Sequence, residues 1–549
     1  MFIKKSWCTV KGKRYYTYQL AESYRPGKGK NPRTRILATI THWPKWLIDK
    51  LSILLKNPES LIITDLGSFF KESYIFGPIL FLYLYMKRIG IIDSLKYIPK
   101  KSRIMLIGVI LNRILDPRSK LGSVSWVKKT IFPYLFGVEK NKLVVSSIYK
   151  AMDKLYKGME KVLEDFFIRN RRGTILLLYD ITSIFFEGKG PKGLARNGFS
   201  RDGKPENVQI LLSLVINEER MPVWYEVLEG NIADKKTVIP LIKRLKERFN
   251  LRNSIFIGDR GMVSLENIEF LEREGIDYII ALTHRKAREL VFKEGIQMEI
   301  FDKRVPVTIY EEEEEGKKRK YILCGSEYRR ERDRKVLEHI LKKGRESLEV
   351  VEKMVKGGRI KDREKIIRRA QKKLVEAKAE VFYDFKYEGG RFEIIEKEEI
   401  IEKAKALCGY YILQTTVEDM SEEEIEERYK ELKFVEDVFR QLKNIAEIRP
   451  IFHWKERRVL THIFLCILAQ TTINKAMEKL KEAGWLQGEK TFSHFRDILE
   501  EINLGIFEIE GGRAEVVTQL KKEQRELIEI FGMDEKVFTN FSKAKKVVD

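Results

Sequence analysis

Between residues 171 and 285 the chain alternates short apolar runs with helical patterns, and this alternation limits the possible folds more than any other feature. The runs with the length and composition of buried strands are residues 174–179, 208–216, 222–228, 254–257 and 278–282. Helical patterns over 235–249 and 265–274 separate the later runs. Because strands that alternate with helices pack as layers, the predicted fold class is α/β.

Two acidic residues follow apolar runs of this region. Asp180 comes directly after 174–179, and Asp259 comes after 254–257 and one glycine. Sheets of α/β proteins place their reactive groups at the ends of strands, so both carboxylates are candidates for a site. Each aspartate taken alone is equally consistent with the cap of a turn or a helix.

A third carboxylate stands on a predicted helix that begins at Ser421. Ser421 and Glu424 form a Ser-x-x-Glu capping box, and no Gly or Pro follows before Pro450, which predicts one long helix. Steps of three and four residues place a mixed set on one side, namely Tyr429, Leu432, Glu436, Arg440 and Lys443. The adjacent apolar stripe expected to be buried is Phe434, Val435, Val438, Phe439 and Leu442.

The three carboxylates together favour a metal site. Mg²⁺ prefers oxygen ligands, and two divalent ions held between carboxylates can activate an attacking oxygen and stabilise a leaving one. Such a site needs no histidine, and the chain has only 6. Asp180, Asp259 and Glu436 are therefore the predicted ligands and catalytic residues of a phosphoryl-transfer site.

The charge of the chain predicts a polyanionic partner. Its 549 residues include 105 Lys and Arg against 82 Asp and Glu, a formal net charge of +23. Nucleic acid is the commonest partner of so basic a chain. A membrane is not expected, because the apolar stretch 459–473 is short and fits a buried helix.

The cysteines and the N-terminus predict a cytoplasmic protein. Cys8, Cys324, Cys408 and Cys466 form no CxxC pair, which argues against a zinc site or a disulfide scaffold. The first residues lack the apolar core of a signal sequence. For a chain that binds DNA, we expect a nucleoid-associated location.

The rest of the chain divides by composition. The predicted parts are a β-rich unit (1–65), a helical DNA-binding domain (66–170), the α/β core (171–285 and 405–483), an α+β insertion (286–404) and a C-terminal tail (484–549). Residues 145–155 are a candidate recognition helix. The charged run of the insertion is most simply a solvated helical hairpin, with DNA contact as the alternative.

Four segments carry a resemblance to a known family. They are YDITSIFFEG with the loop NGFSRDGKPENVQ, GDRGMVSLENIEFL, the helix from Ser421, and IRPIFHWKERRVLTHIFLCILA. In this order they resemble the DDE transposases of the insertion-sequence-four superfamily. Members have an RNase H-like core with an insertion between the second and third acidic residues. Their helix bears Tyr, Arg, Glu and Lys at spacings that Tyr429, Glu436 and Lys443 match, whereas Leu432 replaces the Arg.

The resemblance implies a set of roles. Asp180, Asp259 and Glu436 would hold Mg²⁺ or Mn²⁺, as two ions, and catalyse the reaction. The residues expected to contact DNA are Tyr429, Lys443, Arg440, Arg201 and Arg260. Water would cut the DNA at the element's ends, and the freed 3′-hydroxyl would attack target DNA. The implied partners are the double-stranded terminal inverted repeats, the target DNA and a second copy of the chain in the DNA complex.

Two other functions remain open from the sequence. One is an RNase H-like metal-dependent nuclease that cuts without strand transfer. The other is a catalytically inactive, transposase-derived DNA-binding protein, suggested by Leu432. The GxGxxG pattern at residues 188–193 does not open a helix, so a dinucleotide site is not expected. His453 and His462 are expected to be hydrogen-bonded or to face DNA, and Trp454 is expected to be packed.

Overall fold

The computed structural model describes most of the chain. The described residues are 1–10, 13–26, 31–56, 70–170, 176–249, 251, 253–262, 264–283, 286–287, 289–290, 305–314, 316–488, 490–509 and 512–548. They form two compact units, which we call the N-terminal unit (Met1–Tyr74 with Leu504–Thr518) and the main unit (Ile75–Asn503 with Gln519–Asp549).

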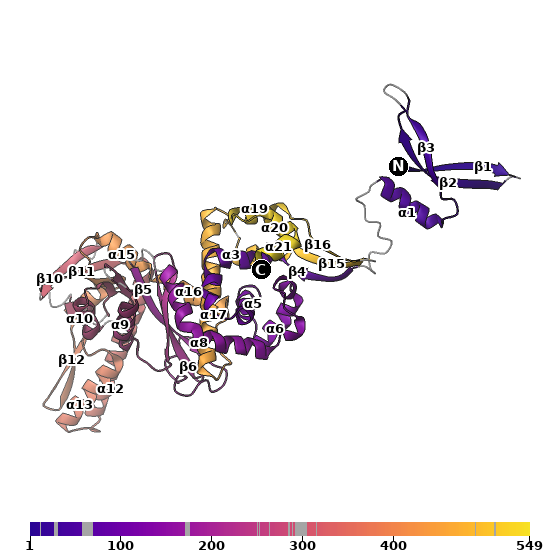
Figure 1. The fold of residues 1–549 in the computed structure, drawn as a ribbon. Coiled ribbons are helices and arrows are strands. Elements are labelled where there is room, and N and C mark those ends of the chain that lie inside the picture. Colours follow the sequence, from indigo (N-terminus) through magenta and orange to yellow (C-terminus); the bar gives the residue numbers. More distant parts are fainter. Residues whose placement is uncertain are drawn as a thin grey trace. The chain divides into compact units, whose positions relative to one another are not determined.

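The N-terminal unit contains two small antiparallel sheets. The strands β1 (Phe2–Val10), β2 (Lys13–Tyr24) and β3 (Arg33–Thr39) form the first sheet, followed by helix α1 (Lys45–Lys56) (Figure 1). The second has the order β16 (Gly512–Val517), β15 (Asn503–Ile509) and β4 (Phe70–Ile75). The rings of Phe70 and Phe507 lie 5.5 Å apart in this sheet. The unit therefore joins segments from both ends of the chain.

The main unit is built on an eight-stranded mixed sheet. Its order is β10 (Val307–Glu314), β11 (Lys317–Gly325), β14 (Tyr410–Thr415), β9 (Asp277–Ala281), β8 (Ile255–Gly258), β5 (Leu176–Phe185), β6 (Gln209–Ile216) and β7 (Pro222–Glu229). The pairs β5–β8 and β8–β9 are parallel, and the other neighbours are antiparallel. The strands expected between 171 and 285 are all present, and the mixed α/β class is confirmed.

Helices cover both faces of this sheet. Tyr179 donates a hydrogen bond to Thr237 Oγ1 at 2.7 Å, at the start of α9 (Val238–Arg248), so odd-numbered residues of this part of β5 face that helix. The neighbouring α10 is Leu265–Arg273. Helix α16 (Lys433–Asn444) packs against β5 and β6, and α8 (Val145–Asn170) against β7. Alternation along the strand points Asp180 away from Thr237.

A helical layer completes the main unit. Its first helices are α3 (Gly77–Arg88), α4 (Ile91–Ser94), α5 (Lys100–Leu115), α6 (Lys120–Lys129) and α7 (Phe132–Leu135), followed by α8. The C-terminal helices are α18 (Phe492–Glu500), α19 (Lys522–Ile530), α20 (Glu535–Thr539) and α21 (Phe541–Val548). The ring of Phe81 on α3 lies 5.4 Å from Phe495 and 4.8 Å from Phe531, so the C-terminal helices pack on this layer.

Helix α17 (Glu456–Glu482) is buried against α5 and α8. Among the described helices it alone is long and apolar enough to cross a membrane by length and composition, but 83% of its apolar window is buried inside the protein. Val459, Ile463 and Ile467 are almost fully buried. The prediction of a buried helix over 459–473 is therefore confirmed, although the helix is longer than that apolar stretch.

The candidate recognition helix forms the first part of α8. Ile148, Met152 and Leu155 are buried in the helical layer. Asp153 accepts hydrogen bonds from Arg457 at 2.8 Å and from Arg458 at 3.2 Å, which ties this helix to α17. Much of its surface is therefore used for packing.

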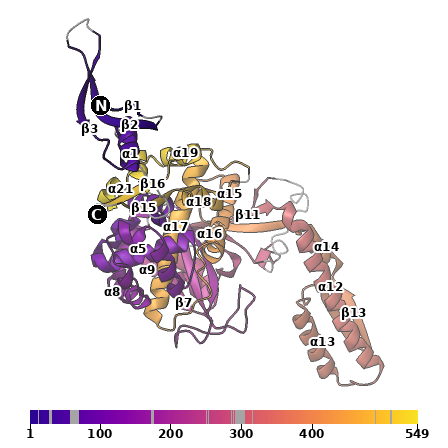
Figure 2. The same ribbon diagram turned by 90° about the vertical axis from the view of Figure 1, so that its right-hand side faces the viewer.

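The insertion expected over 286–404 does not leave the sheet where the sequence suggested. Its strands β10 and β11 extend the main sheet beside β14. Only the following segment projects from it, with α12 (Glu327–Lys356), α13 (Arg363–Ala377), β12 (Tyr383–Glu388), β13 (Arg391–Glu396) and α14 (Glu398–Ala406) (Figure 2). At its base, the Ser326 N–H donates to the Gly409 carbonyl at 2.6 Å.

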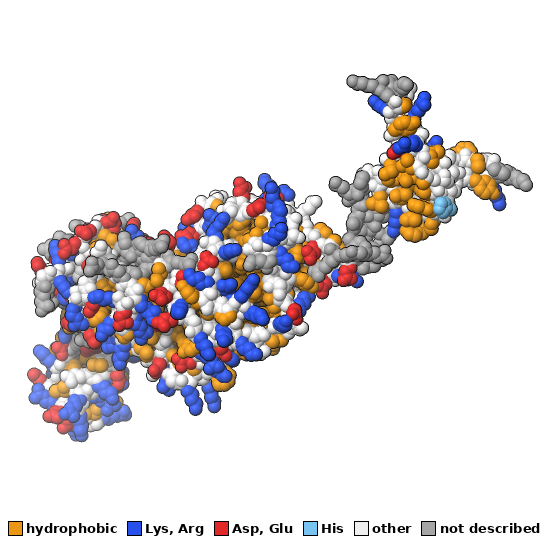
Figure 3. Space-filling model, in the orientation of Figure 1, with side chains coloured by type: hydrophobic (Ala, Val, Ile, Leu, Met, Phe, Trp, Pro, Cys, Tyr) orange, Lys and Arg blue, Asp and Glu red, His pale blue; other side chains and the backbone are white. Residues whose placement is uncertain are grey.

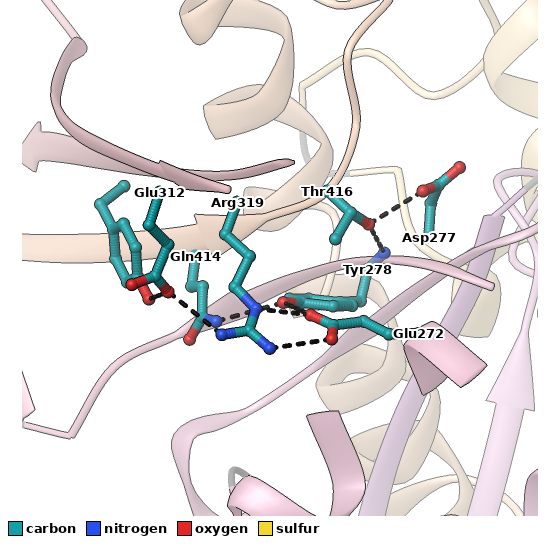
Figure 4. A network of polar contacts seen from close by, with 8 residues as sticks. Glu272, Asp277, Tyr278, Glu312, Arg319, Gln414 and Thr416 are labelled. Carbon is teal, nitrogen blue, oxygen red and sulfur yellow. Dashed lines mark hydrogen bonds and ion pairs between the residues drawn. The ribbon is translucent and has the colours of Figure 1, made fainter. Parts of the chain in front are cut away.

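A buried ionic network fixes β11 to the rest of the sheet (Figure 4). Arg319 on β11 donates to both carboxylate oxygens of Glu272, at 2.7 and 2.9 Å, and lies 3.2 Å from Glu312. Tyr278 donates to Glu272 at 2.9 Å, and Gln414 donates to Tyr278 at 3.1 Å. The network thus joins β9, β10, β11, β14 and the end of α10.

Candidate active site

Asp180 and Asp259 lie at the same level of two neighbouring strands. The parallel pairing of β5 with β8 aligns Tyr179 with Gly258, so the residue that follows each, Asp180 or Asp259, comes next in register. The prediction that Asp180 ends its strand is wrong. Strand β5 continues to Phe185 because β6 pairs with it as far as that residue. Asp180 instead lies where the pairing with β8 stops.

Glu436 reaches this position from a helix that is shorter than expected. The sequence predicted one helix from Ser421, but the structure has α15 (Glu422–Lys430) and α16, separated by a turn at residues 431 and 432. Hydrogen bonds in the turn tighten to steps of three, from Phe434 N–H to the Glu431 carbonyl at 2.7 Å and from Val435 N–H to the Leu432 carbonyl at 3.1 Å. The capping box at Ser421 is confirmed.

The bend changes which residues share a side. Tyr429 and Leu432 are buried, whereas Glu436 and Arg440 are exposed, so the expected single row does not form. Most of the apolar stripe is buried as predicted, with Val435, Val438, Phe439 and Leu442 in the core. Phe434 is half-buried, and the Arg220 guanidinium lies 3.9 Å from the centre of its ring.

One cavity of about 460 Å³ brings the three carboxylates together. Its acidic lining residues are Asp180, Asp259, Glu436, Asp202 and Asp234, and its basic lining residues are Arg201, Arg440, Lys443 and Arg449. Six of the eight residues expected in the site thus line one cavity, although they come from segments far apart in the sequence. The basic side chains give this acidic cavity a means of holding phosphate groups.

Two carboxylates of the cavity hold three of its four basic residues. Lys443 Nζ lies 2.8 Å from Asp202 Oδ1, and Arg449 Nε lies 3.1 Å from the same oxygen. Arg201 donates to Asp234 Oδ2 at 2.6 Å. The side chain of Asp202 is only 4% exposed and that of Lys443 12%. These pairs hold the cations at the wall of the cavity.

Burial and like charges alter the acidity of this site. Burial raises the pKa of Asp180 to about 7, and the nearby charges of Asp259 and Glu436 add to the rise, while a hydrogen bond from the Ile181 N–H opposes it. Burial also lowers the pKa of Lys443, although Asp202 acts against the change. A cation bound beside Asp180 would offset this repulsion among carboxylates.

Two of the expected DNA contacts lie outside the cavity lining. Tyr429 is buried with its ring 5.8 Å from that of Tyr411. Burial raises the pKa of Tyr429 to about 12, and the charge of Asp259 adds to this rise. Arg260 begins the short 3₁₀ helix Arg260–Met262 and is half-buried.

The donor set fits a hard divalent cation by its chemistry. Asp180, Asp259 and Glu436 supply carboxylate oxygens, and among the described residues no histidine or cysteine lines the cavity. As the side chains lie, the described residues include no group of three or more His, Cys, Asp or Glu close enough to hold one ion. Exposed Glu436 on α16 is able to change rotamer, which is the adjustment that ion binding would require.

The other candidate residues, His462, Trp454 and the loop at 188–193, lie outside the cavity lining. His462 is buried, with Nε2 3.1 Å from the Ile448 carbonyl and Nδ1 3.3 Å from Lys120 Nζ, so a hydrogen-bonded His462 is confirmed. The expectation for Trp454 is wrong, because this side chain is 69% exposed. The loop at 188–193 opens no helix, as the sequence predicted.

Sequence reasoning missed Asp202, Asp234 and Arg449. Asp202 lies in a loop, and its partner Lys443 is 241 positions further along the chain, so spacing gives no sign of the pair. Asp234 follows the end of β7 by a few residues. The rule that selected Asp180 and Asp259, an acid close after an apolar run, would have found it.

One comparison with known proteins assigns the chain to a family. The family model described as Transposase DDE domain matches residues 179–471, more than half of the chain, and the chain belongs to this family. DDE transposases cut and join DNA by phosphoryl transfer and depend on a divalent metal, in general Mg²⁺. The matched range begins one residue before Asp180 and includes Asp259 and Glu436.

Two further comparisons add little. The search of curated proteins gives no match to the chain. Among solved structures, the piggyBac transposase synaptic complex with hairpin DNA is similar with a TM-score of 0.37 and 8% identity, over 78% of this chain and 80% of that chain. A likeness this distant carries no argument about the present site.

Proposed function

We propose that the chain is a transposase of the insertion-sequence-four type that acts on the ends of its own element. It binds the terminal inverted repeats, cuts the DNA at the element's ends and joins the freed 3′-hydroxyl to target DNA. The observation that carries this proposal is the meeting of Asp180, Asp259 and Glu436 in one cavity, together with Lys443 and Arg449.

The strand order supports an RNase H-like core for this activity. The strands β7, β6, β5, β8 and β9 are consecutive, with the first three antiparallel and the last three parallel. Helix α9 lies between β7 and β8 in the chain, and α10 lies between β8 and β9. The carboxylates of β5 and of the residue after β8 come from the centre of this arrangement, where the support from neighbouring strands is greatest.

The side chains of the cavity have separable tasks. Asp180, Asp259 and Glu436 would hold two Mg²⁺ or Mn²⁺ ions, and these supply Lewis-acid activation of the attacking oxygen and charge stabilisation at the leaving oxygen. Lys443, Arg440, Arg201 and Arg449 face the same space and can position a phosphate.

A strand-cleavage assay on end-containing DNA tests this function. We expect Mg²⁺-dependent nicking by the unaltered chain and a loss of at least about a hundredfold in Glu436→Gln. Asp437→Asn, one position further on the same helix, is the matched control and should retain activity. Full cleavage by Glu436→Gln, or cleavage that persists after chelation of the metal, would exclude the proposal.

Joined products separate the transposase from a nuclease. The two-ended reaction should yield strand-transfer products when target DNA is supplied, and the family expectation is that a dimer brings both ends together. If only cut ends accumulate, the chain is a metal-dependent nuclease. Binding of ends without any cleavage would indicate an inactive DNA-binding relative.

A further inference from the structure

The insertion carries a second basic surface, away from the carboxylate cavity. A hollow of about 740 Å³ lies along α13. Its basic lining residues are Arg359, Lys361, Lys365, Arg368, Arg369, Lys372 and Lys373, and its acidic lining residues are Asp362 and Glu376. Lys and Arg side chains gather over the projecting helices in the space-filling view (Figure 3).

The two carboxylates of this hollow are already engaged. Asp362 caps α13, because its side chain accepts a hydrogen bond from the Lys365 N–H at 2.8 Å. Glu376 lies 3.2 Å from Lys373. In the described part of the chain, no carboxylate pairs with Lys365, Arg369 or Lys372, and all three are exposed. These three side chains therefore give the hollow cationic charge that its own carboxylates do not pair.

These three residues form one stripe on the helix. Steps of four and three residues place Lys365, Arg369 and Lys372 on the same side, over about 10 Å of helix. The opposite side of α13 is buried in the core of the insertion through Ile366, Ala370 and Leu374. Because that core already uses the apolar side, α13 has no free apolar face to insert into a membrane.

The chemistry of the stripe selects its partner. Duplex DNA carries about one negative charge per 1.7 Å of axis, which gives several phosphates within reach of a 10 Å stripe. The hollow has no aromatic residue on which an unpaired base could stack. Long, flexible cations without other polar groups bind phosphates rather than read base edges.

We infer that the α13 face of the insertion binds the phosphate backbone of duplex DNA without sequence preference. This rests on the proposed function only in the choice of DNA as the polyanion. This contact does not take part in the chemistry at the carboxylates. It is a second site at which the chain binds the DNA whose strand is cut in the cavity.

Two triple variants of the full chain test the inference. The first, Lys365→Gln with Arg369→Gln and Lys372→Gln, removes the unpaired stripe. The second, Lys335→Gln with Arg345→Gln and Lys356→Gln, removes the same charges from α12, where each partner is a glutamate: Glu331, Glu349 with Glu396, and Glu352. Both sets are exposed and should leave the melting temperature nearly unchanged.

Binding is measured by fluorescence anisotropy with a labelled duplex of random sequence, in chelator, over a series of salt concentrations. The α13 variant should bind about tenfold or more weakly at low salt, and its slope of log K against log salt should be shallower by up to about 2.7. The α12 variant should keep the slope of the unaltered chain. A charge-preserving variant, Lys365→Arg with Arg369→Lys and Lys372→Arg, should also keep it.

Three results would overturn the inference. They are an unchanged slope in the α13 variant, an equal loss in both triple variants, and a loss confined to single-stranded RNA in place of duplex DNA. Should the triple variant fold poorly, Arg369→Gln alone should still lower the slope by about 0.9. Because chelator prevents cleavage, a failure of the proposed metal chemistry leaves this comparison intact, and the cleavage assay reports that failure separately.

Discussion

Lys443 Nζ lies 2.8 Å from Asp202 Oδ1, so a lysine expected to contact DNA is held by a carboxylate of the same cavity. Arg449 shares that oxygen at 3.1 Å. The side chains are largely buried, and their charges compensate one another where solvent cannot. Any phosphate that enters must therefore compete with Asp202 for these cations.

Replacement of Asp202 by Asn should destabilise the protein. Lys443 and Arg449 would lose their shared counter-charge, and the free energy of unfolding in urea should fall by about 3 kcal/mol. Asp437→Asn is the control, since Asp437 pairs at 2.9 Å with Arg440, which is 63% exposed. That change should cost less than about 1 kcal/mol. Equal costs for the two variants would contradict the inferred role of burial.

The Arg319–Glu272 pair should show strong coupling in a double-mutant cycle. Both side chains are nearly buried, at 11% and 5% exposure. Arg319→Met leaves Glu272 without its main partner and should cost about 3–5 kcal/mol of unfolding free energy, whereas the double variant with Glu272→Gln should cost clearly less than the sum. Lys318→Met, which removes an exposed pair with Glu311, is the control. Additive effects of the two buried changes would refute the coupling.

The same pair should make stability sensitive to acid. Burial alone would raise the pKa of Glu272, but hydrogen bonds from Arg319 and Tyr278 outweigh it and hold the pKa below the ordinary 4.5. A depressed carboxyl pKa contributes stability above pH 4.5, and this contribution is lost as the pH falls through the folded-state pKa. As the pH is lowered through this range, the unfolding free energy of the unaltered chain should fall more steeply than that of Glu272→Gln. If the unfolding free energies of the two proteins fall in parallel as the pH is lowered, Glu272 does not contribute this acid sensitivity.

Placing at Leu432 the arginine of the insertion-sequence-four helix should not create a DNA contact. Leu432 is 8% exposed in the turn between α15 and α16, so Leu432→Arg places a charge in a packed position. We expect about 1–3 kcal/mol of lost stability and no gain in cleavage. Leu432→Met, which conserves volume, should stay close to the unaltered chain. Faster cleavage by a stable Leu432→Arg variant would show that an arginine at this position can take part in the reaction.

The sequence was sufficient for the elements that depend on local pattern. Apolar runs located the strands of the core, the capping box located the start of α15, and the stripe of α16 is buried at Val435, Val438, Phe439 and Leu442. The convergence of Asp180, Asp259 and Glu436 on one cavity was also expected. This convergence was expected because Asp180 and Asp259 follow apolar runs and because the chain resembles a known family. The periodicity of the helix alone would not have predicted it.

What the sequence could not predict depends on tertiary partners. Strand β5 continues beyond Asp180 because β6 pairs with it as far as Phe185. The apolar run 174–179 does not predict this pairing with β6. The turn at residues 431 and 432 contains no Gly or Pro, so no residue there marks the break between α15 and α16. The pairing of Asp202 with Lys443 joins distant loops and helices, and local spacing does not encode it.

The hydrogen bond between Ser326 and Gly409 closes the base of the projecting segment. Gly325 and Tyr410 are paired residues of β11 and β14. The polypeptide therefore leaves the sheet after Gly325 and returns to it at the paired residue, Tyr410. In topology, everything from Glu327 to Cys408 is the loop of a β-hairpin. A tight turn could replace it without any strand changing its neighbours. The Gly325–Tyr410 pair is therefore a point at which residues 327–408 can be exchanged for another segment. The order of the strands around the carboxylates would stay the same.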